Sequence, residues 1–430
     1  MATAISNTQV WQLHPHEIAT GRLCKVAILG FGTVGSAVAN ILVQKRSPKL
    51  QLKYIYNRNI AGKRVSWAGT DVLWTEDIEE VLHSDVDVIV ELAGGVEPAA
   101  SWIRKALLAG KSVVTANKQV IAAHGPDLTQ LAESGGCHLE YGAAVAGAVP
   151  VLCALQRGLN GDRLIRISGI LNGTCNYILS AMERDGVSLQ TALAEAQRCG
   201  FAESDPSDDI DGKDARAKLA ILIRTAFQVQ VRPEQIGAES IGGITGEDFE
   251  YASRLGYTIR QVAQAEFDRE KGGVRAHVGP ALVPLSSPLA RAHGSDNVLM
   301  TMGEHSGEMV FSGAGAGGAP TAVAVVSDLL SIAQSRSHFN HHVSASVCVP
   351  VNNDIAFERY VRLSTNLRSN IASIEDALAK HGLKTRTAFQ NEHGALVIDS
   401  CTDVVLQKAL REIADNDCGC KDAFSLPVMT

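Results

Sequence analysis

Short apolar runs alternate with longer amphipathic stretches along the first 150 residues. The apolar runs predict strands, because strands buried on both faces of a parallel sheet contain few polar residues. The stretches between them have the length and composition of helices, as at 36–44. Alternating strands and helices form a parallel sheet with helices on both faces, so we predict a doubly wound α/β domain over residues 22–150. The predicted strands are 25–29, 50–56, 86–92, 112–115 and 138–141.

The pattern changes after residue 150. Strands are predicted at 163–171 and 308–311, and helices after residue 172, at 188–199, at 214–226 and up to 333. The last part of the chain has the order strand, helix, strand, strand, helix, strand, with clear runs at 359–363, 371–381, 395–398 and 404–414. The predicted organisation is an N-terminal extension (1–21), the α/β domain, an α+β substrate and dimerisation domain (151–319), a helix returning to the first domain with a linker (320–357), and a small α+β domain (358–430).

Charge and cysteine content narrow the possible environments and partners. The formal net charge is −7 over 430 residues, so no basic excess is available to displace counterions from phosphates, and we expect no nucleic-acid partner. Nine scattered cysteines, an odd number, indicate a reducing, cytoplasmic environment. Cys418 and Cys420 have no second Cys/His pair nearby, so we interpret them as structural and not as zinc ligands. No secretory signal or membrane-spanning run is evident.

A glycine-rich turn follows the first predicted strand directly and precedes a helix. In this context the glycines allow a tight turn and a close approach of pyrophosphate to the helix N-terminus, which is the fingerprint of Rossmann-type dinucleotide-binding folds. A glycine-rich turn in another kind of α/β protein is the alternative. The candidate cofactor-binding residues are Gly30, Phe31, Gly32, Thr33, Val34 and Gly35.

The second predicted strand ends in Asn57 and Arg58, where an acid would bind the ribose 2′-hydroxyl of NAD. Arg58, Lys63 and Arg64 are suited instead to a 2′-phosphate, so NADP is favoured over NAD. The alternative is that these cations belong to a solvated loop.

Carboxylates crowd between residues 203 and 214, where Gly200 and Pro206 are expected to prevent helix formation. Asp214 and Lys218, four residues apart, could form a surface ion pair. A calcium loop fails because Lys218 stands where the site needs a bidentate Glu. A third interpretation starts from the apolar face beside Lys218: a lysine at the edge of a buried face, aimed at carboxylates in a cleft, is a candidate for proton transfer.

The order Ala-x3-Gly-Phe-Ala (196–202) and Asp-Pro-x2-Asp-Ile-x-Gly-x-Asp-x3-Lys (205–218) resembles the signature of the homoserine dehydrogenase family. The resemblance implies NAD(P)-dependent interconversion of L-homoserine and L-aspartate 4-semialdehyde, on the path to threonine, methionine and isoleucine. Two other functions stay open from the sequence alone. They are a dehydrogenase for another amino-alcohol, and an amino-acid sensor on the same fold without turnover.

The resemblance also implies roles for individual residues. Lys218 would transfer the proton, facing Lys118 across the cleft, and each cation would favour the neutral amine of the other. Asp214 would hold the substrate hydroxyl or orient Lys218. Glu203, with Asp209 as a weaker candidate, would bind the substrate ammonium, while Asp205, Asp208 and Asp211 are expected to be structural. Gly173 and Thr174 would contact the amino acid, and Thr115, Lys118 and Gly315 the cofactor.

These assignments have simpler alternatives. Lys118 could be an ordinary lysine at a strand end, Thr174 a helix cap, and the loop around Gly315 a plain flexible segment. The segment 141–150 resembles the family's site for a monovalent cation, with carbonyls from Val145, Gly147 and Val149. The residue at its Glu position is Gly142, and Glu140 would point to the opposite face of a strand, so we assign no metal.

The C-terminal order of elements resembles an ACT domain, an amino-acid-sensing module of longer homoserine dehydrogenases. Residues 366–370 read Asn-Leu-Arg-Ser-Asn where that module usually has Asp-x-Pro-Gly. The domain could therefore bind an effector or serve only dimer contacts. We expect a homodimer or homotetramer.

Overall fold

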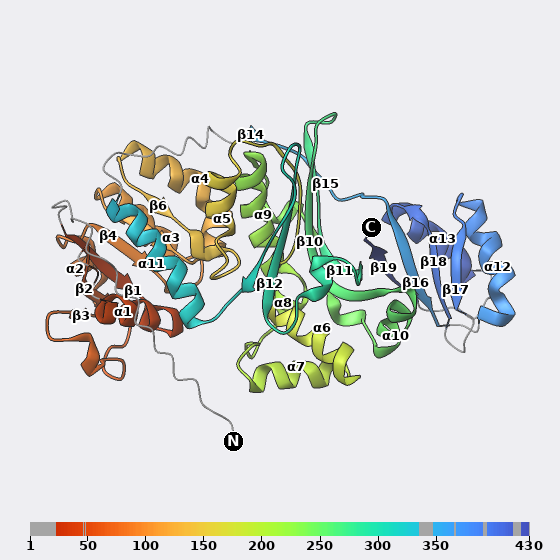
Figure 1. Cartoon of the computed structure of the whole chain (residues 1–430), viewed down its shortest axis with the longest axis horizontal. Coiled ribbons are helices and arrows are strands. Elements are labelled where there is room, and N and C mark those ends of the chain that lie inside the picture. The colour runs from red at the N-terminus through yellow and green to blue at the C-terminus, as the bar shows by residue number, and fades with distance from the viewer. Residues whose placement is uncertain are drawn as a thin grey trace, which may run out of the picture.

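The computed structural model describes residues 23–45, 47, 49–334, 347–364, 367–389, 394–415 and 423–429. Figure 1 shows an elongated molecule with a helix-covered sheet at one end, a long antiparallel sheet in the middle and a small α+β unit at the other end. The predicted N-terminal extension, residues 335–346 of the predicted helix and linker segment, and Cys418 and Cys420 lie outside the described residues.

The first sheet is parallel throughout, as predicted, with the order β3-β2-β1-β4-β5-β6. Its strands 1, 4 and 5 are almost fully buried, which is why they appear as apolar runs. The short strand β3 was not predicted, because three residues with an exposed leucine carry no periodic signal. The bounds are β1 (Cys24–Leu29), β2 (Leu50–Tyr56), β3 (Leu73–Thr75), β4 (Val88–Glu91), β5 (Ser112–Thr115) and β6 (Leu139–Glu140).

Helices cover both faces of this sheet. On one face α1 (Thr33–Lys45) packs with α11 (Gly318–Gln334), which follows strands of the central sheet in the chain and returns to this one. On the other face lie α2 (Ile78–Leu82), α3 (Ala99–Leu108) and α4 (Lys118–Ser134). Helix α1 begins three residues before the predicted start, inside the glycine-rich turn, so its free N–H groups face that turn.

The central sheet is built on the long hairpin of β10 (Tyr257–Asp268) and β11 (Gly273–Pro284), which the sequence analysis left unassigned. Beside β10 follow β7 (Leu164–Ile170), β12 (Asp296–Gly303) and β13 (Gly307–Ala314). Two short strands, β9 (Gly237–Ala238) and β15 (Val351–Asn352), pair with β11. The predicted linker therefore contributes β15, and also β14 (Val347–Cys348), which pairs with β8 (Val229–Gln230).

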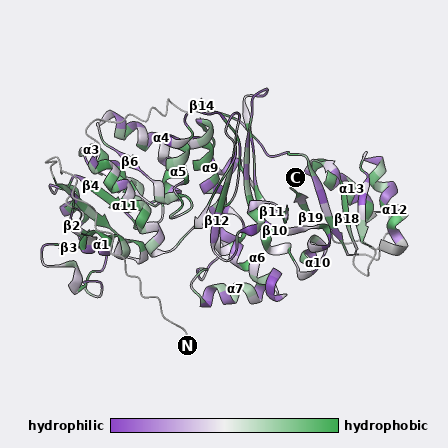
Figure 2. Ribbon diagram, in the orientation of Figure 1, coloured by the Kyte–Doolittle hydropathy of each residue, from purple (hydrophilic) through white to green (hydrophobic). Residues whose placement is uncertain are grey.

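Helices α6 (Gly173–Asp185), α7 (Leu189–Arg198), α8 (Ser207–Ile210), α9 (Lys213–Phe227) and α10 (Gly246–Leu255) accompany the central sheet. Helix α9 carries a fully apolar stripe into the core against β7 and β10. The outer helix α7 shows purple, hydrophilic turns in Figure 2. The short α5 (Val151–Cys153) leads out of the first sheet.

The C-terminal unit has the predicted order of elements: β16 (Phe357–Leu363), α12 (Leu367–Lys380), β17 (Thr385–Phe389), β18 (Gly394–Cys401), α13 (Asp403–Asp415) and β19 (Ala423–Val428). Its sheet is continuous with the central one, because β19 pairs with β16 on one side and with β11 on the other. Tyr360, Leu426 and Val428 are buried in the same cluster as residues of α6 and α10. The unit therefore shares a core with the central sheet.

Candidate active site

The glycine-rich turn joins β1 to α1 at the carboxyl edge of the parallel sheet. A Cβ on Gly30, which has φ +99°, would lie 2.7 Å from the oxygen of Leu92, and a Cβ on Gly35 would lie 2.0 Å from the oxygen of Gly30. Only glycine fits at these two positions. At Gly32 a Cβ would meet no described atom within 4 Å, so the backbone there is open to a ligand. With no acidic residue in the first turn of α1, this helix N-terminus suits an anion.

The end of β2 lies against the same turn. The N–H of Phe31 donates to Asn57 Oδ1 at 3.1 Å, and the buried Phe31 ring meets Trp74 edge-on at 4.8 Å between centroids. Asn57 Nδ2 donates to the Asn59 carbonyl at 2.8 Å, so its amide is used to hold the loop. The neighbouring Arg58 is exposed.

Thr115, at the end of β5, is fully buried. Its hydroxyl donates to Glu91 Oε2 at 2.7 Å and accepts from the N–H of Asn117 at 3.0 Å. Asn117 caps α4 by accepting from the N–H of Val120, and burial raises the pKa of Glu91. The hydroxyl of Thr115 thus holds the turn in front of Lys118.

Lys118, Asp214 and Lys218 form a lysine–carboxylate cluster between the two large sheets. Asp214 Oδ1 lies 2.6 Å from Lys118 Nζ, and Oδ2 lies 2.7 Å from Lys218 Nζ. Lys218 Nζ also donates to the Leu171 carbonyl at 2.7 Å. The side chains of Lys218 and Asp214 are only 13% and 6% exposed, so the interpretation as a surface ion pair is wrong. The two lysines do not face each other directly, because one carboxylate lies between them.

The Asp214 carboxylate changes the pKa of Lys118 in the direction opposite to the one predicted. Burial favours the neutral amine of Lys118, but attraction by Asp214, supported by Asp209 and Glu203, outweighs burial and raises its pKa. The prediction of a favoured neutral amine is therefore wrong for Lys118 in this arrangement. Burial likewise acts to raise the pKa of Asp214, but the two ammonium groups outweigh it, and its pKa falls below the usual range.

Asn172 also belongs to this site, although no role was predicted for it from the sequence. Its Nδ2 donates to Asp209 Oδ1 at 2.6 Å and to Asp214 Oδ2 at 2.9 Å, while its Oδ1 accepts from the N–H of Cys175. Asn172 is thus the cap of α6, and the alternative of a cap at Thr174 is wrong. The available signal was a short polar residue directly between a strand and a helix.

A cleft of about 420 Å³ opens beside the lysine–carboxylate cluster. Its lining includes Lys118, Glu203, Asp209 and Asp214. Glu203 is exposed at the chain surface, whereas Asp209 is half-buried, and burial raises its pKa. Six carboxylates and three cationic side chains, Lys118, Lys213 and Arg216, line the cleft, and this surplus of negative charge suits a small substrate carrying an amine.

Gly173 and Thr174 lie at the start of α6, next to Asn172. The Thr174 hydroxyl donates to the Phe201 carbonyl at 2.8 Å. Gly173 packs on Ser295, where a Cβ would lie 2.8 Å from the backbone oxygen. Neither residue belongs to the lining of the cleft.

The acidic stretch is not entirely a loop, because residues 207–210 form the short helix α8. Asp205 Oδ1 accepts from the N–H of Ser207 at 3.1 Å, just before this helix. Asp208 and Asp211 lie 3.8 and 3.5 Å from Lys213 Nζ. The side chains of Asp205, Asp208 and Asp211 therefore contact residues of the same segment, whereas Asp209 and Asp214 contact Asn172.

The loop after β13 brings further backbone to the glycine-rich turn. A Cβ on Gly318 would lie 2.9 Å from Thr33 Cγ2, and one on Gly147 would lie 2.6 Å from the Gly315 oxygen. Gly315 therefore lies between the segment 141–150 and the start of α11, which packs on α1.

In the segment 141–150, which the resemblance compares with a cation site, the carboxylate next to position 142 comes from Asp328 of α11 and not from the segment itself. The N–H of Gly142 donates to Asp328 Oδ2 at 2.9 Å, and the carboxylate of Asp328 fills the space of a side chain at position 142. Strand β6 ends at Glu140, so strand alternation does not apply, and Glu140 lines the same pocket as Asp328 instead of the opposite face. Burial and the nearby Glu140 raise the pKa of Asp328 to about 7. In the described part of the chain no group of three or more His, Cys, Asp or Glu side chains is placed to hold a metal.

A dinucleotide fits the open glycine turn at the N-terminus of α1, and Lys118 follows β5 at the same carboxyl edge of the sheet. These features define the class of protein: an NAD(P)-dependent oxidoreductase with a cleft beside its lysine–carboxylate cluster.

Comparison with known proteins gives the family. The family model "Homoserine dehydrogenase, NAD binding domain" matches residues 30–142, and "Homoserine dehydrogenase" matches residues 150–330. The Corynebacterium glutamicum homoserine dehydrogenase is 36% identical over 416 residues, covering 90% of this chain and 93% of its own, and that of Mycobacterium tuberculosis is 45% identical over 320 residues, 72% of each chain. A homoserine dehydrogenase structure from Thiobacillus denitrificans matches with a TM-score of 0.88 and 31% identity over 95% of this chain and 98% of its own. A hyperthermophilic archaeal homoserine dehydrogenase in complex with NADPH matches with a TM-score of 0.61 and 27% identity over 72% and 97%.

This chain belongs to the homoserine dehydrogenase family. It is an NAD(P)-dependent oxidoreductase of amino-acid biosynthesis that interconverts L-homoserine and L-aspartate 4-semialdehyde. The relatives set aside the two alternatives of a sensor without turnover and a dehydrogenase for another amino-alcohol. No helix in the described ranges is both long enough and apolar enough to cross a bilayer.

Proposed function

We propose that Lys218 exchanges a proton with the substrate hydroxyl and that the Lys118 ammonium stabilises the oxygen while its charge changes. The observation that carries this proposal is the single Asp214 carboxylate bound to both ammonium groups. An ammonium has three N–H donors. Lys218 directs two of them at Asp214 and at the Leu171 carbonyl, and among the described residues the third has no acceptor and is available to a substrate oxygen.

In the oxidation direction the neutral amine of Lys218 takes the O–H proton, and C4 of homoserine loses a hydride and becomes a carbonyl carbon. The oxidised nicotinamide, when bound, accepts that hydride. In the reduction direction Lys218 returns the proton to the same oxygen. Asp214 keeps both lysine head groups in place through the cycle, and Asn172 fixes the Asp214 carboxylate from the side.

The amino-acid part of the substrate is recognised by charge. Glu203 and Asp209 bind the substrate ammonium, since both line the cleft on the side of Lys118. The substrate carboxylate binds beside the cleft at the start of α6, through the backbone N–H groups of Gly173 and Thr174, since the Thr174 hydroxyl already donates to the Phe201 carbonyl. The helix N-terminus favours an anion there.

The cofactor preference follows from the end of β2. Asn57 is tied to Phe31 and Asn59, and Arg58, Lys63 and Arg64 are exposed around it. A guanidinium at this place favours a 2′-phosphate, so the preferred cofactor is NADP. Substituting Arg58→Ala lowers kcat/KM for NADP by about tenfold and leaves that for NAD unchanged, in keeping with the loss of one charged hydrogen bond.

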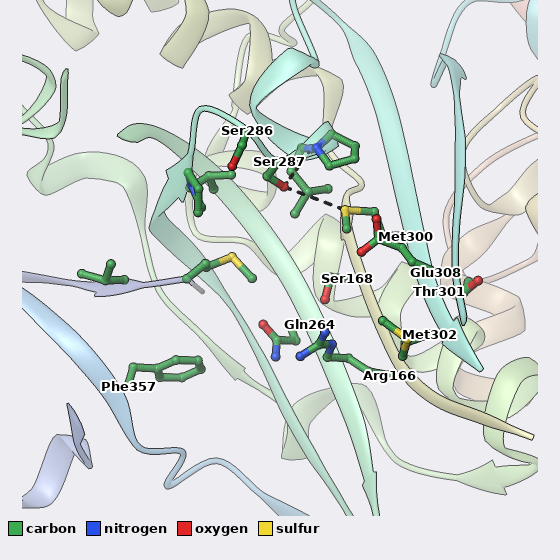
Figure 3. Close-up of a pocket in the computed structure, with 16 residues that line it drawn as sticks. Arg166, Ser168, Gln264, Ser286, Ser287, Met300, Thr301, Met302, Glu308 and Phe357 are labelled. Carbon is green, nitrogen blue, oxygen red and sulfur yellow. Dashed lines mark hydrogen bonds between the residues drawn. The ribbon is translucent and has the colours of Figure 1, made fainter. Parts of the chain in front are cut away.

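The chain forms a homodimer through the face of the central sheet that is opposite α9. Ile167 and Leu299 face the core with α9, so the alternate residues Arg166, Ser168 and Met300 face the other way. A cavity of about 330 Å³ lies on that side. Figure 3 shows methionine and polar side chains lining it, among them Met300 and Ser168. A second copy covers this face, and light scattering of the purified chain tests the expected mass.

The C-terminal unit is an ACT-like domain, with the strand order β19-β16-β18-β17 as support. The compartment is the reducing cytoplasm, in keeping with the absence of disulfides among the described cysteines.

Initial rates of nicotinamide reduction with L-homoserine test the proposed chemistry. Lys218→Ala lowers kcat by about 10²- to 10⁴-fold, the usual contribution of a general acid–base group, and leaves cofactor binding intact. Glu203→Gln mainly raises KM for L-homoserine. The matched control is Lys105→Ala, an exposed lysine of α3 that pairs with Glu79 and does not line the cleft, so this variant leaves kcat unchanged. A Lys218→Ala variant with the native kcat removes the proposal.

A further inference from the structure

Asn297 of β12 lies under the glycine loop and touches the carbonyl that holds Lys218. Its side chain is 1% exposed, and its Nδ2 donates to the Leu171 oxygen at 3.2 Å. The same oxygen accepts from Lys218 Nζ at 2.7 Å. A Cβ on Gly315 would lie 2.1 Å from Asn297 Cγ, so the amide fills the space beneath that loop. The Asn297 Oδ1 atom is buried without a hydrogen-bond partner in the described part of the chain.

We propose that Asn297 is a positioning residue that sets how firmly the Leu171 carbonyl holds the Lys218 ammonium. The inference rests on the proposed proton transfer by Lys218. A carbonyl oxygen has two lone pairs, and two donors that share one buried oxygen weaken each other's hold on it. Asn297 therefore eases the loss of a proton from Lys218 and, because it also supports Gly315, connects this effect to the loop expected to contact the cofactor.

The other titratable groups around Lys218 act from four elements. Asp214 lies on α9 itself, Lys118 on α4, Asp209 on α8 and the buried Cys175 thiol on α6. They are unchanged by substitutions at position 297, which is on the central sheet. A change in the pH dependence of turnover can therefore be assigned to the Leu171 carbonyl.

The test is the pH profile of kcat for L-homoserine oxidation in Asn297→Leu and Asn297→Asp, two variants of similar size. In Asn297→Leu the competing amide N–H is gone, so the Leu171 carbonyl holds the Lys218 ammonium more firmly. The acidic limb of the profile therefore moves to higher pH by about half a unit to one unit. It moves further in Asn297→Asp, because a carboxylate adds attraction. In the lower part of the limb kcat falls by about three- to tenfold.

Asn176→Leu is the matched control, since Asn176 is also a fully buried amide and donates to the carbonyls of Ala292 and Gly294, away from Lys218. It loses thermal stability without moving the acidic limb. If both Asn297 variants lower kcat equally at every pH, the residue is only structural and the inference is overturned. If the residual activity of Lys218→Ala still shows the acidic limb, Lys218 is not the group that titrates. That result removes the proposed role of Lys218, and it can be told apart from a failure of the inference on Asn297.

Discussion

Asp214 Oδ1 of α9 lies 2.6 Å from Lys118 Nζ of α4, and this contact connects the helix of the central sheet to the helix of the parallel sheet. Lys118 is the first residue of α4, where a cation meets the unfavourable end of the helix dipole. The buried carboxylate outweighs that effect and raises the pKa of Lys118. This ion pair therefore adds to the packing of Gly125 on Arg224 in setting how α4 lies against α9.

Substituting Asp214→Asn removes this ion pair with little change in shape. Both lysines lose their countercharge, so we expect kcat to fall by about 10²-fold or more. We also expect a loss of about 2–4 kcal/mol in the free energy of unfolding, discounted because Lys118 is 37% exposed. The pKa of Asp214 is lowered by folding, so its contribution is present above about pH 4 and is lost as the pH falls. Chemical unfolding at pH 3 and pH 7 should therefore show a smaller pH effect in the variant than in the native protein.

Substituting Gly125→Ala tests how α4 is held against α9. In an open helix this change stabilises by up to about 1 kcal/mol. Here the new Cβ would lie 2.1 Å from Nη1 of Arg224, a buried residue of α9 that also stacks over the Tyr141 ring at 5.4 Å. We expect a loss of about 1–3 kcal/mol, as for an overpacked core, and a lower kcat because α4 carries Lys118.

Thermal unfolding checks this expectation against a second glycine. A Cβ on Gly158 would meet no described atom within 4 Å, so Gly158→Ala should be neutral or stabilising. In an Arg224→Ala background the penalty of Gly125→Ala should largely disappear. Additive effects in that double-mutant cycle would contradict the steric explanation.

Substituting Asp328→Asn should stabilise the protein at alkaline pH. Burial and Glu140 raise the pKa of Asp328 to about 7, above the unfolded value of about 3.9. Between these values the folded state keeps a proton that the unfolded state has released, so stability falls as the pH rises from 4 to 7. Asparagine does not ionise and can still accept from the N–H of Gly142. The variant should gain about 2–4 kcal/mol at pH 8 and almost nothing at pH 4, as measured by denaturant unfolding.

Glu140→Gln is the companion variant for this measurement. It removes the neighbouring charge but leaves Asp328 buried, so the fall in stability with pH should shrink without disappearing. An Asp328→Asn protein that is equally stable to the native one at both pH values would show that this carboxyl ionises normally.

Substituting Arg362→Met tests the junction between the C-terminal unit and α10. Asp248 is fully buried, and it accepts from the Tyr360 hydroxyl and from Arg362 Nε, both at 2.8 Å. Without the guanidinium the buried carboxylate loses its countercharge, so we expect a loss of about 2–4 kcal/mol. Tyr360→Phe should cost about 1–2 kcal/mol. If denaturant unfolding gives the opposite order, the hydroxyl and not the charge holds this junction.

Much of the architecture could be predicted from local pattern. The strands of the parallel sheet appear as apolar runs because both of their faces are buried, and Gly30 and Gly35 are required by sterics that act within a few residues. The contact between Asp214 and Lys218 is also local, because residues four apart lie side by side on a helix, and it could be predicted from their spacing.

Features that depend on distant contacts could not be predicted in this way. The Asp214 carboxylate is shared with Lys118, almost 100 positions earlier, so the raised pKa of that lysine has no local signal. Asp328 reaches Gly142 across 186 positions and takes the space of a side chain at that position. Helix α8 forms despite Pro206 because proline is tolerated just before a first helical turn.

The pairing of Leu282 with Val428 also has a consequence for the order in which the protein is made. Val428 and Leu426 fill the same apolar cluster as α6 and α10, more than 170 residues earlier in the chain. The strands of the parallel sheet are synthesised first. This sheet can therefore fold while synthesis continues, and α11 packs on it later. The cluster of α6 and α10 cannot close until β19 has left the exit tunnel of the ribosome. Until then these two helices keep apolar surface uncovered.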